Sequence, residues 1–74
     1  MAEHLRKAIE HWKRASDEAR DAENILALES ERFESLGGTP PDPNLVKEAA
    51  RLRAVADEAL AAAVAAMDAA RQRS

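Results

Sequence analysis

Both glycines and all three prolines of the 74-residue chain lie between positions 37 and 43, in the segment GGTPPDP. Gly37 stands where the C-terminus of a helix favours a residue with positive φ, and the prolines that follow cannot continue a helix. Asp42 followed by Pro43 is typical of a new helix N-terminus, with Asp as the N-cap and Pro at the first helical position. The segment is therefore a predicted turn between two helices.

The sequence on either side of this turn contains no helix breaker. Residues 2–36 and 44–72 are rich in Ala, Glu, Arg and Leu, which have high helix propensity. We therefore expect an all-α fold that forms one helical-hairpin domain over residues 1–74. Its helices should cover about 2–36 and 43–72, with the turn at 37–42.

Both predicted helices carry apolar residues, mostly alanine, in rows with seven-residue spacing. The first helix has the rows Leu5, Trp12, Ala19, Leu26, Phe33 and Ala8, Ala15, Ala22, Glu29, Leu36. The second helix has the rows Leu45, Leu52, Ala59, Ala66, Arg73 and Ala49, Ala56, Ala63, Ala70. Such rows are typical of helices that pack along each other, and alanine lets two helices approach closely. The prediction is an antiparallel, Ala-rich coiled coil with a hairpin seam formed by Ala8, Trp12, Ala15, Ala22, Leu26, Phe33, Leu45, Leu52, Ala56, Ala63, Ala66 and Ala70.

The register of the hairpin can be predicted from residue numbers, because facing positions in an antiparallel pair have a constant sum. A sum of 78, which centres the turn on Thr39, places Ala15 opposite Ala63. In this register, large side chains face small ones, or apolar side chains face apolar ones, at almost every level. We therefore expect the two helices to pair with this sum.

The same register predicts two ion pairs beside the seam. One joins Glu23 to Arg53, and the other joins Arg32 to Glu48. Oppositely charged residues at such positions fix the orientation of a coiled coil. Glu29 falls in the seam near the turn, opposite a small residue, where a partly exposed carboxylate would discourage other registers.

The chain has few large apolar residues for a stable core. It contains 18 alanines, only 16 larger apolar residues and no cysteine, so neither a bulky core nor a disulfide supports the hairpin. The segment ALAAAVAAM at 59–67 is apolar on nearly every face, which is typical of a buried helix. We therefore expect self-association, as a homodimer that forms a four-helix bundle. The predicted oligomer or partner interface consists of Ile9, Val46, Leu60, Val64 and Met67. A heterologous helical protein partner is the main alternative, and a monomer with alanine on its solvated faces is another.

No pattern in the sequence indicates catalysis, a cofactor or a metal. His4 and His11 are seven residues apart, about 10 Å along a helix, which is too far for them to hold one ion together. A thin hairpin also offers no concave site. We therefore expect a non-enzymatic protein without catalytic residues, cofactor or metal.

The sequence contains no stretch that resembles a signal peptide or a membrane span. The start MAEHLRKAIEHW is polar, and no window approaches the roughly 18 uninterrupted apolar residues of a membrane helix. We therefore expect a cytoplasmic protein with no membrane segment. The preference for Ala and Arg over Lys favours a GC-rich bacterial source.

Nucleic-acid binding is an alternative function that depends on one basic row. Arg6, Lys13 and Arg20 share seven-residue spacing and could follow phosphates. Against this, the net charge is −3, and Glu3 with Lys7 is an ordinary i,i+4 pair of a solvated helix face. Nucleic acid is therefore the less expected partner.

Two resemblances extend these alternatives. In its seven-residue Ala and Leu rows the chain resembles the Rop family of plasmid copy-number regulators, which implies a dimeric four-helix bundle that binds paired RNA loops at its basic end. The stretch from Pro41 to Leu45 resembles the turn of type III secretion needle subunits, which implies a small helical subunit or chaperone of a larger assembly. The charged ending RQRS departs from the apolar C-terminus of those subunits. The function expected first remains a protein–protein interaction or assembly module that self-associates.

Overall fold

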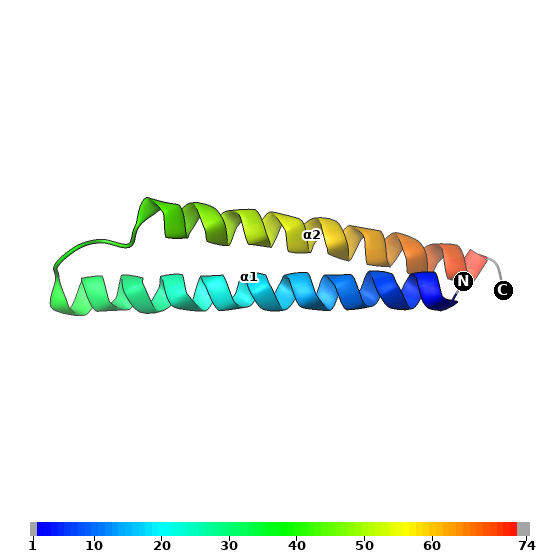
Figure 1. Cartoon of the computed structure of the whole chain (residues 1–74), viewed down its shortest axis with the longest axis horizontal. Helices are drawn as coiled ribbons and strands as arrows, with labels where there is room; N and C mark the ends of the chain where they lie inside the picture. Colours follow the sequence, from blue (N-terminus) through cyan, green and yellow to red (C-terminus); the bar gives the residue numbers. More distant parts are fainter. Residues whose placement is uncertain (1, 73–74) are drawn as a thin grey trace.

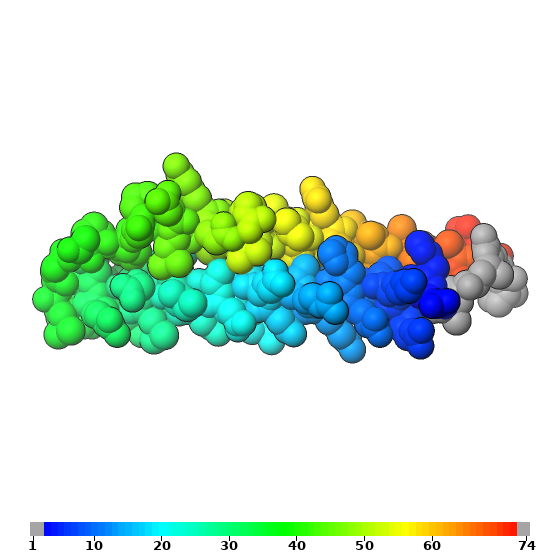
Figure 2. Space-filling view, in the orientation of Figure 1, coloured from blue at the N-terminus to red at the C-terminus, as the bar shows by residue number. Residues whose placement is uncertain are grey.

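The chain forms two long helices packed side by side. In the computed structural model, which describes residues 2–72, these are α1 (Ala2–Leu36) and α2 (Pro43–Gln72), and they run antiparallel (Figure 1). The hairpin measures 58 × 14 × 14 Å, and Figure 2 shows the two helices in contact over most of its length. The prediction of an all-α antiparallel hairpin is confirmed.

Local hydrogen bonds end α1 and begin α2 at the turn. Gly37 has φ of +75° and donates its N–H to the carbonyl oxygen of Phe33 at 2.8 Å, which closes the last turn of α1. Asp42 accepts two hydrogen bonds, both at 2.9 Å: its carboxylate Oδ1 accepts the N–H of Asn44, and its carbonyl oxygen accepts the N–H of Leu45. These bonds satisfy backbone groups that would otherwise lack partners at the helix ends.

The core between the helices is made of alanine. Among the described residues, the buried side chains are Ala15, Ala19, Ala49, Ala56, Ala59, Ala63 and Ala66. Burial of a methyl group removes little apolar surface from water, so each buried alanine side chain stabilises the fold by only about 0.8 kcal/mol. The hairpin therefore has a continuous but shallow core, and none of the large side chains that the structure describes is fully buried.

The predicted register is wrong by one seven-residue step. One buried cluster joins Trp12, Ala15 and Ala19 to Leu52, Ala56 and Ala59. These six side chains meet at three successive levels if facing positions sum to 71, as for Ala15 opposite Ala56, and not to 78. Figure 1 shows the same offset, because the last turns of α1 extend past the start of α2 and residues 37–42 run back between them.

This offset leaves two of the predicted seam residues outside the buried seam. Phe33 is 38% exposed because the start of α2 lies further along the hairpin, and Ala70 is exposed because α2 reaches the beginning of α1 there. The remaining predicted seam residues lie in the seam as buried or half-buried side chains: Ala8, Trp12, Ala15, Ala22, Leu26, Leu45, Leu52, Ala56, Ala63 and Ala66. A step of seven residues exchanges alanine for alanine along the row Ala49, Ala56, Ala63 and Ala70, and it puts Leu52 in place of Ala59 opposite Ala19, so the seam stays apolar.

One of the two predicted ion pairs is present. Arg53 donates two hydrogen bonds to the carboxylate of Glu23, at 2.9 and 2.6 Å, and this bridge joins the two helices. The pair predicted between Arg32 and Glu48 is wrong, because Arg32 lies beyond the start of α2 in the observed register. Its guanidinium lies 3.9 Å from Glu29, which is exposed and not opposite an alanine of the seam.

Candidate interface on the hairpin

The Glu23–Arg53 bridge shows which rows of the two helices lie on the same side of the seam. Residues at seven-residue spacing share one face of such a helix, so the neighbours of these two residues lie there too. We call this side the Leu60 face. It consists of Ile9, Ser16, Glu23 and Ser30 of α1 and Val46, Arg53, Leu60 and Met67 of α2.

Large apolar side chains are exposed on the Leu60 face. Leu60 is 41% exposed, Met67 37% and Val46 46%. Val64 lies at the outer edge of this face, four residues after Leu60 and three before Met67, and is 45% exposed. Ile9 of α1 is half-buried. The five residues predicted as an interface therefore lie on one side of the hairpin, with four of them toward the open end and Val46 toward the turn.

The ion pair divides this face into two parts. The two hydrogen bonds from Arg53 hold the pKa of the Glu23 carboxylate below its ordinary value of 4.5, although partial burial opposes this shift. Both side chains remain partly exposed, Glu23 to 40% and Arg53 to 41%. The Leu60 face thus has a bridged ion pair at its centre, and its apolar part lies between this pair and the open end of the hairpin.

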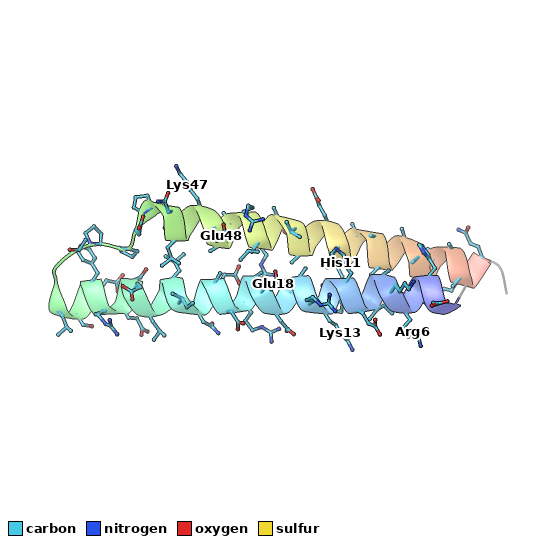
Figure 3. All side chains as sticks on the ribbon, viewed as in Figure 1. Arg6, His11, Lys13, Glu18, Lys47 and Glu48 are labelled. Atoms are coloured by element: carbon cyan, nitrogen blue, oxygen red, sulfur yellow. The ribbon has the colours of Figure 1, made fainter. Side chains whose placement is uncertain are left out.

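Charged residues border the Leu60 face. Arg6, Lys13 and Arg20 are exposed along its α1 edge, and Figure 3 shows Arg6 and Lys13 leaving α1 on the side away from α2. Arg20 is near enough to Glu23 to favour the charged carboxylate. On the α2 edge, Asp57 is exposed. The row predicted to contact nucleic acid is thus the basic edge of the apolar face, and an acidic residue stands on the opposite edge.

The other side of the seam is more polar. Ile25 is 51% exposed and Val55 36%, but charged groups lie near them. Figure 3 shows Glu18 and Glu48 on the side of their helices that meets the partner helix. Glu48 is bridged by Arg51, and the hydrogen bonds from this arginine lower the pKa of Glu48. This side is therefore a poorer apolar interface than the Leu60 face.

A second apolar surface lies at the turn end of α1. Leu36 is 81% exposed and Leu28 61%, and together with Glu31, Arg32 and Ser35 they line an open, shallow hollow. This site was not predicted, because the sequence pattern placed Leu36 in the seam. The overhang of α1 past α2 is what exposes it, and only the correct register would have indicated it.

The described residues offer no metal site or membrane span. His4 and His11 are exposed, and within residues 2–72 no three His, Asp or Glu side chains are grouped so that they could hold an ion. Within the same part of the chain, neither helix combines the length and the apolar character that crossing a membrane requires.

Comparisons with known proteins give no functional assignment. No protein-family model, no curated protein and no solved structure matches the chain. The architectural resemblances to Rop and to needle subunits therefore remain predictions. The function has to be inferred from the surface of the hairpin, above all from the Leu60 face.

Proposed function

We propose that the chain is a small protein–protein interaction module that self-associates through the Leu60 face and has no catalytic role. The observation that carries this proposal is the exposure of Leu60, Val64 and Met67 together, beside Ile9, on one side of the hairpin. Neighbouring exposed apolar side chains of this kind mark interaction sites, whereas single ones are normal on any protein surface.

The size of the hairpin fits this role. A face of 58 by 14 Å has a footprint of about 800 Å², and a stable interface buries about 800 Å² on each partner. A second copy reaches this value only if it covers the whole length of the face. The alanine core also leaves the isolated hairpin with little buried surface, so association would supply much of its stability.

A four-helix bundle gives each helix two packing surfaces. In such a bundle every helix contacts one neighbour through the hairpin seam and another through the adjacent face. The rows of the Leu60 face adjoin the seam in both α1 and α2, as this geometry requires. The bundle would place Ile9, Leu60 and Met67 in a second layer of core.

The basic row of α1 supports an edge of a protein interface better than a nucleic-acid site. Arg6, Lys13 and Arg20 are exposed, but Glu10 and Asp17 are exposed on the neighbouring turns of the same helix. These acids weaken the positive potential that phosphate binding needs. The row can still contribute charge at the border of an apolar face.

The test is the mass of the purified chain in solution, measured by light scattering or sedimentation at micromolar concentration. We expect a multiple of the 8.1 kDa chain mass, and we expect Leu60→Glu to reduce it to 8.1 kDa because the carboxylate would be buried in the interface. Ala61→Glu is the matched control, since it introduces the same charge one residue away on the exposed outer side of α2.

Two results would contradict the proposal. One is a folded wild-type monomer of 8.1 kDa at these concentrations. The other is an equal loss of mass with Ala61→Glu and Leu60→Glu, which would show that the Leu60 face is not the interface. A chain that gains helix only with a different protein would favour a heterologous partner in place of a second copy.

A further inference from the structure

We propose, on the basis of the self-association above, that the two hairpins lie parallel, with both turns at the same end of the dimer. The two-fold axis then runs along the length of the hairpins, and α1 of each copy packs on α2 of the other. A second copy of the chain therefore covers the Leu60 face, in one of the two orientations that span its full length.

The starting point is the uneven distribution of apolar side chains along this face. Ile9, Leu60, Val64 and Met67 lie toward the open end, whereas Ser30 lies with Val46 toward the turn. A parallel dimer of full overlap brings the two apolar parts together. An antiparallel dimer of full overlap still brings Leu60 level with Val46 of the partner copy, but it places Ile9 near Glu23 of the partner copy and Met67 near the partner's turn.

In the parallel dimer the helices of different copies meet in nearly the same register as the helices of one hairpin. The observed sum of about 71 then brings Ile9 level with Leu60 of the partner copy, and symmetry repeats this contact. Ser16 comes level with Arg53 of the partner copy, where a small side chain leaves room for the bridged guanidinium. Ile9 therefore meets an apolar residue and Arg53 a small one, while Glu23 comes level with Val46 of the partner copy.

The charges on the two edges agree with this orientation. Lys13 on the α1 edge comes level with Asp57 on the α2 edge of the partner copy, and both side chains are exposed in the single hairpin. The two-fold axis produces this pair of opposite charges twice. Opposite charges at the borders of an interface fix register and orientation.

The antiparallel dimer brings like charges together. Its two-fold axis crosses the middle of the hairpins, so that α1 packs on α1 and α2 on α2. Lys13 then lies near Arg20 of the partner copy, and Arg53 lies near Arg53 of the partner copy. Like-charge contacts at an interface suppress the corresponding arrangement.

The experiment is a distance measurement between spin labels at the two turns. The chain contains no cysteine, so Thr39→Cys provides a single labelling site in each copy, on an exposed residue of the turn. In the parallel dimer the labels should be separated by roughly two helix diameters, about 20–25 Å. In the antiparallel dimer their separation should approach the 58 Å length of the hairpin.

Ala54→Cys is the matched control, because this exposed residue lies near the middle of the hairpin and gives a short distance in either orientation. A short distance from Ala54 and a long one from Thr39 would overturn the parallel arrangement and leave self-association intact. The absence of any dipolar signal from both labels would contradict self-association itself, and the orientation with it.

A charge reversal gives a second readout with opposite signs for the two orientations. In the parallel dimer Lys13→Glu faces Asp57 and should weaken association by about 3- to 10-fold over the two symmetric contacts. Adding Asp57→Lys should restore the affinity. In the antiparallel dimer Lys13→Glu would face Arg20, so tighter association of this single variant would overturn the proposal.

Discussion

The two halves of the hairpin differ in how their helices are held together. In the open half, where residues 2–20 pack on residues 52–72, small side chains such as Ala19 and Ala59 are buried almost completely. In the turn half, Leu26 and Leu45 are only half-buried, and Phe33 is 38% exposed. The most completely buried positions are thus alanines, because an alanine row lets two helix backbones approach closely.

This difference also separates stability from recognition. In the open half the seam holds alanines together with Trp12 and Leu52, and the larger residues Leu60 and Met67 lie beside it and remain available to a partner. In the turn half Ala49 is buried, and local bonds add to the seam, namely the caps at Gly37 and Asp42 and the bridge formed by Glu23. Substitutions in the two halves should therefore act through different physical causes.

The largest expected effect is that of added bulk in the open half. Ala19→Leu keeps the helix propensity high but inserts a large side chain at a position that is 0% exposed, so the helices must separate. We expect a loss of about 1–3 kcal/mol in the free energy of unfolding, measured by urea denaturation. Ala61→Leu, an equal change on an exposed face, should be close to neutral. Equal stability of both variants would show that close packing does not hold this half.

Loss of the α2 cap should destabilise the turn half to a smaller extent. Asp42→Ala removes the side-chain oxygen that accepts the N–H of Asn44, and we expect a loss of about 1 kcal/mol. Asp42→Asn retains an acceptor and should restore most of this stability. Hydrogen exchange should show faster opening of the first turn of α2 in Asp42→Ala. Unchanged exchange there would mean that packing, and not the cap, holds the start of α2.

The contrast between the halves also explains which features could be predicted from the sequence. The turn is predictable because glycine and proline act locally, and the structure shows Gly37 at positive φ and Asp42 as a side-chain cap. The hairpin is predictable because the seven-residue rows define one seam per helix. Neither inference depends on which residues face each other.

The register could not be predicted in the same way. A shift of seven residues exchanges one alanine for another along the row Ala49, Ala56, Ala63 and Ala70, for example Ala63 for Ala56 opposite Ala15, and keeps apolar residues in the other row. The sequence pattern therefore barely distinguishes the sums 71 and 78. In the observed register Trp12 packs against the cluster that contains Ala59, and residues 37–42 run back from the end of α1 to the start of α2. The hollow at Leu28 and Leu36 depends on the register, so the sequence pattern could not indicate it.

The smallest expected effect concerns the bridge between the two halves. Arg53 lowers the pKa of Glu23 in the folded chain, so folding favours the charged carboxylate, and the bridge stabilises the protein at pH values above the ordinary pKa of 4.5. This contribution disappears as the pH falls through the lowered pKa of the folded state. Solvent screens the pair because the side chains of Glu23 and Arg53 are 40% and 41% exposed. We therefore expect Glu23→Gln to lower the Tm slightly at neutral pH and to match the wild type in strong acid. Glu31→Gln removes the same charge from an exposed position of the same helix and is the matched control. A Tm difference for Glu23→Gln that persisted in strong acid would show that Glu23 acts through packing and not through its charge.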